Sequence, residues 1–133
     1  MQIIESKVWS KLEFVFLIIK ERLDPWPIFK NSKVFALYDK NNLISFCTVK
    51  SWNKSVELGT LVTKKAYRGK GYANKVIKYF LNKYPSSYVT CHLSLENFYN
   101  KFGYKRVEKA PYKIYQRIKF ANLFGYRYII MKR

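Results

Sequence analysis

The sequence predicts a single α+β domain with a mixed, mainly antiparallel sheet of six to seven strands flanked by helices. The chain is 133 residues long, which suits one domain spanning residues 1–133. Runs rich in β-branched and aromatic residues follow one another over residues 33–63, as in an antiparallel meander. From Gly71 the apolar residues change to the period of an amphipathic helix. Strands and helices in this order are typical of the α+β class.

The N-terminal residues predict a short strand followed by a helix. Residues 2–9 are compatible with a strand. Ser10 and Glu13 then have the spacing of a capping box, and Trp9 is placed to face Phe14 as a hydrophobic staple. The helix is therefore expected to begin at Ser10.

Prolines end this helix and open the next segment. The helix is expected to continue to about Leu23, because Pro25 and Pro27 lack an N–H donor and disfavour helix in the residues before them. Residues 24–33 are predicted to form a loop. Strands are predicted next at KVFALYD, LISFCTVKSW and SVELGTLVT, the first two joined by a polar turn over residues 39–42.

Helical periodicity returns after the third of these strands. One apolar stripe comprises Ala73, Val76, Ile77, Phe80 and Leu81, and the helix should stop before Pro85. We then expect a strand at SYVTCHL, a short helix at SLENFYNKF closed by Gly103 in a left-handed conformation, and strands at YKRVE and YRYIIMKR. Residues 109–125 are too long for a hairpin turn, so they are expected to form a lid or a partner surface.

The charge of the chain indicates an anionic partner. Lysine and arginine total 26 against 8 acidic residues, a formal net charge of +18. Such a protein attracts polyanions. A nucleic-acid or ribosome partner, a polyphosphate cofactor and a merely solvated basic surface all remain open at this point.

Cysteine content and hydropathy bear on metals and location. Cys47 and Cys91 lie in apolar, strand-like runs, so we expect buried thiols rather than a disulfide. Two cysteines and one histidine cannot build a structural zinc site by themselves, so no metal is expected. The apolar run FVFLII is too short to span a bilayer, and the N-terminus lacks the order of a signal peptide. We therefore expect a cytoplasmic protein, with monomer and homodimer both open.

A glycine-punctuated basic turn follows the third strand of the meander. Gly69 and Gly71 do not complete the dinucleotide pattern, because Asn74 stands where its third glycine should be, and no Walker A sequence is present. Glycine still allows positive φ and close approach of a ligand, and a helix N-terminus supplies free N–H donors. With Arg68, Lys70 and Lys75 nearby, the turn is either an anion site or a tight connection that binds nothing.

Two longer segments carry a family resemblance. Arg68-Gly69-Lys70-Gly71-Tyr72-Ala73 follows a strand ending in Leu61-Val62-Thr63, and Phe98-Tyr99 is followed by Gly103-Tyr104 further on. Together they resemble the acetyl-CoA signature and a second motif of the GNAT superfamily of N-acetyltransferases, over roughly residues 34–107. The resemblance implies a GNAT-like fold. His92 and Leu95 stand where the family often has Asn and Ala, so His92 is not among the expected cofactor contacts.

The resemblance also implies a role for each residue. The pyrophosphate of acetyl-CoA would lie on the amides of Arg68 to Ala73, and its pantetheine beside Leu61, Val62 and Thr63, where a β-bulge near Gly59 would part the strands. Tyr99 would be the general acid for the leaving thiolate, Glu57 the general base acting through water, and the Val62 N–H the oxyanion donor. The acetyl group would pass directly to a primary amine within a ternary complex.

The acceptor and one rival function stay open. A cationic site repels polyamines and basic protein tails, so acidic peptides, aminoacyl-tRNA or an amine on a ribosomal particle fit better. The acceptor is expected between the 24–33 loop and the 109–125 segment. The rival is a basic nucleic-acid- or ribosome-binding module, in which the interleaved Lys, Arg and Tyr of APYKIYQRIKF contact RNA. A degenerate GNAT fold with only a binding role is a further alternative.

Overall fold

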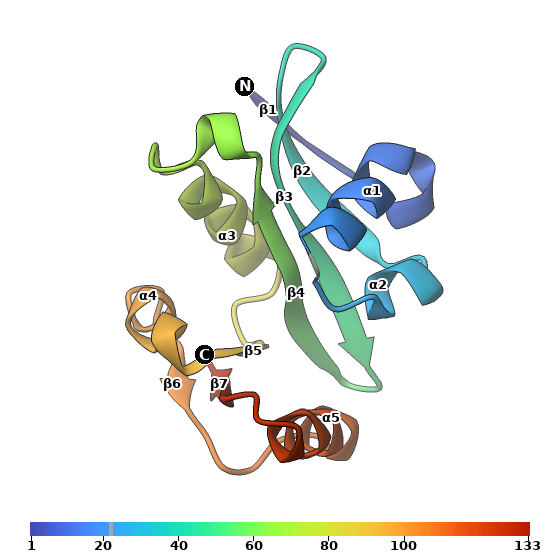
Figure 1. Ribbon diagram of the computed structural model, residues 1–133. Coiled ribbons are helices and arrows are strands. Elements are labelled where there is room, and N and C mark those ends of the chain that lie inside the picture. Colours follow the sequence, from blue (N-terminus) through green and yellow to red (C-terminus); the bar gives the residue numbers. More distant parts are fainter. Residues whose placement is uncertain (22) are drawn as a thin grey trace. The chain divides into compact units, whose positions relative to one another are not determined.

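The structure is a computed structural model that describes residues 1–21 and 23–133 (Figure 1). The described chain divides into two compact units. Unit 1 comprises Met1–Lys50 and Leu58–Lys83, and unit 2 comprises Ser51–Glu57 and Tyr84–Arg133. Residues 51–57, where the chain turns from the third strand into the fourth, therefore belong to unit 2. No described helix is long and apolar enough to cross a membrane.

The predicted N-terminal strand and the three strands of the predicted meander build the sheet of unit 1. They are β1 (Gln2–Lys7), β2 (Lys33–Asp39), β3 (Asn42–Trp52) and β4 (Ser55–Thr63). β2 pairs antiparallel with both β1 and β3. The turn between β2 and β3 places Lys40 at a φ of +55°. The predicted strands are confirmed with nearly the bounds expected of them.

The beginning of the first helix differs from the prediction. Val8–Ser10 form a single 3-10 turn (η1), and α1 (Leu12–Lys20) starts after Lys11 without a side-chain cap. Ser10 Oγ donates a hydrogen bond backward to the Lys7 carbonyl at 2.6 Å, so the capping box is wrong.

The expected staple is also wrong, because the cap residue of α1 is Lys11, so that Ser10 and not Trp9 directly precedes the cap. The indole N–H of Trp9 donates to the Ile28 carbonyl at 2.8 Å and its backbone N–H to Asn31 Oδ1 at 3.0 Å. These bonds tie the start of α1 to the segment after it. That segment, predicted to be a loop, contains the short helix α2 (Trp26–Phe29), which begins beside Pro25.

Alternation along β2 builds a core on each face of the unit 1 sheet. Val34, Ala36 and Tyr38 pack with the buried side of α1. Phe35, on the opposite face, contacts Phe80 of α3 (Tyr72–Lys83), with ring centroids 6.2 Å apart. Figure 1 shows α1 and α2 on one side of these strands and α3 on the other. A strand that is buried on both faces reads as a continuous apolar run, as KVFALYD does.

Unit 2 is built around its last strand. β7 (Tyr128–Lys132) pairs antiparallel with β5 (Tyr88–His92) and with the two-residue β6 (Lys105–Arg106). Between β5 and β6 lie the 3-10 turn η3 (Leu93–Leu95) and α4 (Glu96–Asn100), followed by Gly103 at a φ of +90° as predicted.

The 109–125 segment, expected to form a lid or a partner surface and not assigned a helix from the sequence, contains a regular helix. This helix is α5 (Tyr112–Leu123). It starts directly after Pro111, and Gly125 follows it at a φ of +90°. Ile114 and Ile118, one turn apart, are its buried residues. Proline before and glycine after are the usual boundaries of a helix.

The fold class is the one predicted. The described residues form seven strands, flanked by helices, and each strand pair described above is antiparallel, as in a mainly antiparallel α+β fold. Cys47 and Cys91 are buried free thiols, as expected.

Candidate active site

The backbone between β4 and α3 takes a conformation that requires glycine. After the 3-10 turn η2 (Lys65–Tyr67), Gly69 and Gly71 have φ angles of +77° and +80°. Glycine adopts these angles without strain, whereas a side chain does not. A Cβ atom added to either residue would meet no atom within 4 Å. The glycines are therefore needed for the turn itself, and the surface beside them is uncrowded.

This turn presents N–H groups and positive charge together. Within the described chain, no group accepts a hydrogen bond from the N–H of Gly69, Lys70 or Gly71. The first turn of α3 adds the positive end of its dipole. Lys70 and Lys75 are exposed, and the Lys75 ammonium stands 5.8 Å from the centre of the Tyr72 ring. Such a group of donors fits a phosphate or pyrophosphate.

Arg68 connects the turn to neighbouring segments through hydrogen bonds of its side chain. Its Nε donates to the Thr63 carbonyl at 2.9 Å, and its Nη2 donates to Glu21 Oε1 at 3.1 Å. A guanidinium has five N–H donors, so these bonds leave donors for an anion. Arg68 is 49% exposed, which keeps those donors within reach of solvent.

The strand end before the turn is anchored from β3. The hydroxyl of Ser45 donates to the Val62 carbonyl at 2.8 Å and lies 2.9 Å from Thr63 Oγ1. Val62 is buried in the core beside α1, whereas Leu61 and Thr63 are half-buried. Ser45 was not predicted, since a serine inside an apolar strand gives no sequence signal of its partner.

Gly59 in β4 allows the two strands to approach closely. A Cβ atom at this position would lie 2.3 Å from Thr48 Oγ1 and 3.0 Å from the Thr48 carbonyl oxygen. The same Thr48 hydroxyl accepts a hydrogen bond from the Thr60 N–H at 2.9 Å. The Thr48 side chain is thus bonded to β4 directly beside Gly59. The bulge expected near Gly59 stays a prediction.

Glu57 lies in a buried polar cluster within unit 2. Its side chain is 0% exposed. Oε2 accepts a hydrogen bond from Trp52 Nε1 at 3.1 Å, and Oε1 accepts one from Thr90 Oγ1 at 3.0 Å. Arg117 of α5 completes the cluster, with Nη1 3.7 Å from Oε2 and its guanidinium 5.3 Å from the centre of the Trp52 ring. The sequence alone did not reveal these partners, which come from three separate segments.

Tyr99 lies on α4 in an aromatic environment. It is buried, and its ring meets the rings of Phe98 and Tyr104 edge-on, with centroids 5.0 and 5.9 Å apart. The Tyr99 carbonyl accepts hydrogen bonds from the backbone of Phe102 and Tyr104 at 3.0 and 3.3 Å. The position of Tyr99 is thus set by both its side chain and its backbone.

His92 caps η3. Its Nδ1 accepts a hydrogen bond from the Ser94 N–H at 3.1 Å, and its ring meets Tyr128 edge-on at 6.4 Å. It lies at the end of β5, as the sequence indicated.

Similarity to solved structures supports the fold. N-acetylglutamate synthase from Neisseria gonorrhoeae, in complex with coenzyme A and N-acetyl-glutamate, matches with a TM-score of 0.72 and 10% identity over 100% of this chain and 35% of that one. An acyl-CoA N-acyltransferase from Pseudomonas aeruginosa matches with 0.69 and 12% identity over 99% and 98% of the two chains. ElaA of Escherichia coli matches with 0.68 and 13% identity over 100% and 99%.

The family is established by a sequence model. A search of curated proteins found no match. The model of the acetyltransferase (GNAT) domain, however, matches residues 30–106, which span β2 to β6 and include the glycine turn and Tyr99. Because this match covers more than half of the chain, the protein belongs to the GNAT acetyltransferase family.

Proposed function

We propose that this protein is an N-acetyltransferase that moves an acetyl group from acetyl-CoA to a primary amine within a ternary complex. Residues 1–133 act as one catalytic domain in this proposal. The observation that carries it is the row of N–H groups at Gly69, Lys70 and Gly71, which have no acceptor in the described chain and precede α3. Membership of the GNAT family supports acetyl-CoA as the ligand of this turn.

The residues around the turn suit the cofactor. The amides from Arg68 to Ala73 would hold the pyrophosphate, with charge from Arg68, Lys70 and Lys75. Leu61, Val62 and Thr63 would lie along the pantetheine. The only chemistry the cofactor supplies is an activated thioester.

Acetyl transfer forms a C–N bond and breaks the C–S bond of the thioester. The carbonyl oxygen gains negative charge as the amine attacks, and the Val62 N–H is our candidate to stabilise it. The phenol of Tyr99 donates a proton to the departing sulfur. Glu57 takes the proton that the amine loses.

Glu57 needs a water molecule for this role. Its carboxylate is buried and already accepts bonds from Trp52 and Thr90. A carboxylate has about four lone-pair positions, so it retains capacity for a water that relays the proton. The acceptor amine therefore does not have to contact Glu57 directly.

The acceptor class follows from charge. A chain with a net charge of +18 attracts amines that carry negative charge elsewhere, such as acidic peptides or aminoacyl-tRNA. Cationic surroundings also favour the neutral, nucleophilic form of the amine. A screen of amino acids, acidic peptides and aminoacyl-tRNA with acetyl-CoA, followed by thiol release, would identify the acceptor. CoA binding without turnover across this panel would support a binding-only role.

Binding of CoA is tested with a matched pair of glycine variants. Gly71→Glu places bulk and negative charge where the pyrophosphate should lie, so CoA should no longer raise Tm. Gly125→Glu introduces the same side chain at a φ of +90° with no atom within 4 Å of the Cβ, and controls for backbone strain. It should retain the full CoA shift. An unchanged CoA shift in Gly71→Glu would exclude the turn as the cofactor site.

A further inference from the structure

The outer side of α5 and the turn after it expose an unusual number of aromatic side chains. Ile114 and Ile118 are the buried residues of α5, whereas six large residues elsewhere on the helix and just after it are 44% to 77% exposed. We name this set the α5 aromatic surface; it comprises Tyr112, Tyr115, Phe120, Leu123, Phe124 and Tyr126. Exposed apolar groups that gather in this way usually mark an interaction site.

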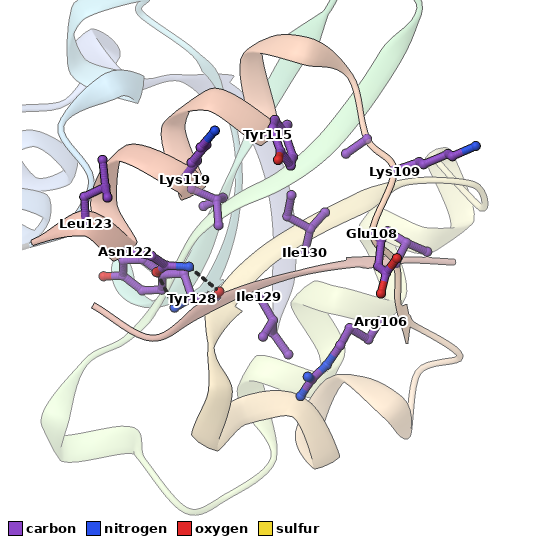
Figure 2. Close-up of a pocket in the computed structure, with 13 residues that line it drawn as sticks. Arg106, Glu108, Lys109, Tyr115, Lys119, Asn122, Leu123, Tyr128, Ile129 and Ile130 are labelled. Atoms are coloured by element: carbon purple, nitrogen blue, oxygen red, sulfur yellow. Dashed lines mark hydrogen bonds between the residues drawn. The ribbon is translucent and has the colours of Figure 1, made fainter. Parts of the chain in front are cut away.

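A groove adjoins this surface. It has a volume of about 1090 Å³ and lies between α5 and the strands β6 and β7. Figure 2 shows Tyr115, Lys119 and Leu123 on the helix side of the groove and Ile129 and Ile130 on the strand side. Its lining is largely apolar, and the charged residues in it are three cations and one carboxylate: Arg106, Lys109, Lys119 and Glu108.

Planar rings continue beyond the groove. Tyr126 and Tyr128 stack with their ring planes 7° apart and their centroids 5.4 Å apart. Phe120 lies on α5 and Phe124 directly follows this helix, and their ring centroids are 5.0 Å apart. Tyr126 and Phe124 are both exposed, so their outer faces are available to flat ligands. Stacking of nucleobases on such rings is largely independent of sequence.

Charge selects the class of partner. Lys109 and Lys119 line the groove, and in the described chain no acidic residue pairs with either. Arg106, by contrast, is neutralised by a bidentate bond to Glu96 at 2.7 and 3.0 Å. Exposed Lys113 adds a further cation on α5. A second copy of a chain with +18 charge would bring like charges together, which disfavours self-association.

We propose that the α5 aromatic surface and its groove bind single-stranded nucleic acid. The bases stack on Tyr115, Phe120 and Tyr126, and the phosphates lie near Lys119 and the neighbouring lysines. This combination of cations and aromatic rings is the usual basis of binding to single strands. The proposal stands independently of acetyl transfer, because none of these residues is assigned to cofactor binding or to catalysis.

The aromatic contribution is tested by fluorescence anisotropy with a fluorescein-labelled oligouridylate. Phe120→Ala and Tyr126→Ala should each weaken binding by about 5-fold or more, the loss expected for one stacked base. Phe16→Ala is the matched control, since Phe16 is 60% exposed on α1 and Phe120 is 64% exposed on α5. It should bind as wild type. Equal affinity in all these variants would overturn the proposal.

The electrostatic contribution is tested through salt dependence. Lys119→Gln should reduce the slope of log K against log salt by about 0.7, the value for one phosphate contact on a single strand. Lys78→Gln removes the same charge from an exposed position on α3 and should change the slope less. Equal changes in both variants would show that only overall charge attracts the oligonucleotide, and would overturn the assignment to α5.

Two further outcomes would reassign the surface. If polyglutamate of equal charge displaces the oligonucleotide as well as unlabelled oligouridylate does, the surface accepts acidic polymers in general and the proposal fails. If sedimentation shows a dimer that Phe120→Ala dissociates, with oligonucleotide binding unchanged, the surface is an interface between copies. Gly71→Glu should bind the oligonucleotide as wild type, which separates this proposal from that of the cofactor site.

Discussion

The indole N–H of Trp52 donates a hydrogen bond to Oε2 of Glu57 over 3.1 Å, at the tip of the β3–β4 hairpin. Arg117 approaches the same carboxylate oxygen and also lies over the Trp52 ring. The Arg117 guanidinium thus interacts both with the Glu57 carboxylate and with the Trp52 side chain that donates to this carboxylate. A buried carboxylate is stable only while such partners remain.

Removal of Arg117 should therefore destabilise the protein. We expect Arg117→Met to cost roughly 2 to 3 kcal/mol, less than for a fully buried pair because Arg117 is 28% exposed. Urea unfolding measures the change. Glu57→Gln combined with Arg117→Met should lose less than the sum of the single variants, because the double variant contains no buried unpaired charge. Additive losses would mean that the two side chains do not interact.

Local patterns were sufficient for much of the fold, but contacts between distant segments were not visible in them. KVFALYD and the stripe from Val76 to Leu81 carry their periods within a few residues, so β2 and α3 were predicted correctly. α5 was missed because Ile114 and Ile118 are its only buried residues and its exposed side is rich in aromatics. A helix with an apolar outer side does not have the amphipathic pattern.

The candidate site shows the same division. The turn at Gly69 and Gly71 was predicted because positive φ is a local property that glycine reveals. The burial of Glu57 was not predicted, since Thr90 and Arg117 are far from it in sequence. At Ser10, a short 3-10 turn uses the hydroxyl that a capping box would require. A spacing rule cannot distinguish these two uses of one serine.

Gly59 should tolerate no side chain, for steric reasons. Gly59→Ala places a methyl group 2.3 Å from Thr48 Oγ1, so we expect a loss of about 1 to 3 kcal/mol in urea unfolding. Thr48→Ala removes the nearest atom, and the double variant should therefore lose less than the two single variants together. Gly69→Ala, where nothing lies within 4 Å, should show only the cost of positive φ, about 1 kcal/mol. A smaller loss at Gly59 than at Gly69 would contradict the close approach of the strands.

Cys91 should make stability fall at alkaline pH. Burial raises the pKa of its thiol from an ordinary value of 9.0 to about 11. The folded state therefore holds this proton more tightly than the unfolded state does. The resulting stabilisation is complete below pH 9.0 and is lost as pH rises towards about 11. Cys91→Ala should show a shallower decline of the urea midpoint over this range than wild type, whereas parallel curves would show that the thiol does not contribute.

Tyr99→Phe should separate catalysis from cofactor binding. Loss of the phenol should lower kcat by about 100-fold or more, with the CoA-induced shift in Tm nearly unchanged, because only the proton for the departing thiolate is lost. Tyr104→Phe is the matched control: the Tyr104 hydroxyl lies 2.6 Å from buried Ser87 Oγ, so its removal should cost about 1 kcal/mol of stability but little turnover. Equal rates for wild type and Tyr99→Phe would remove Tyr99 from the acid role. A similar fall in both variants would indicate a defect in packing around α4, since the two rings contact each other edge-on.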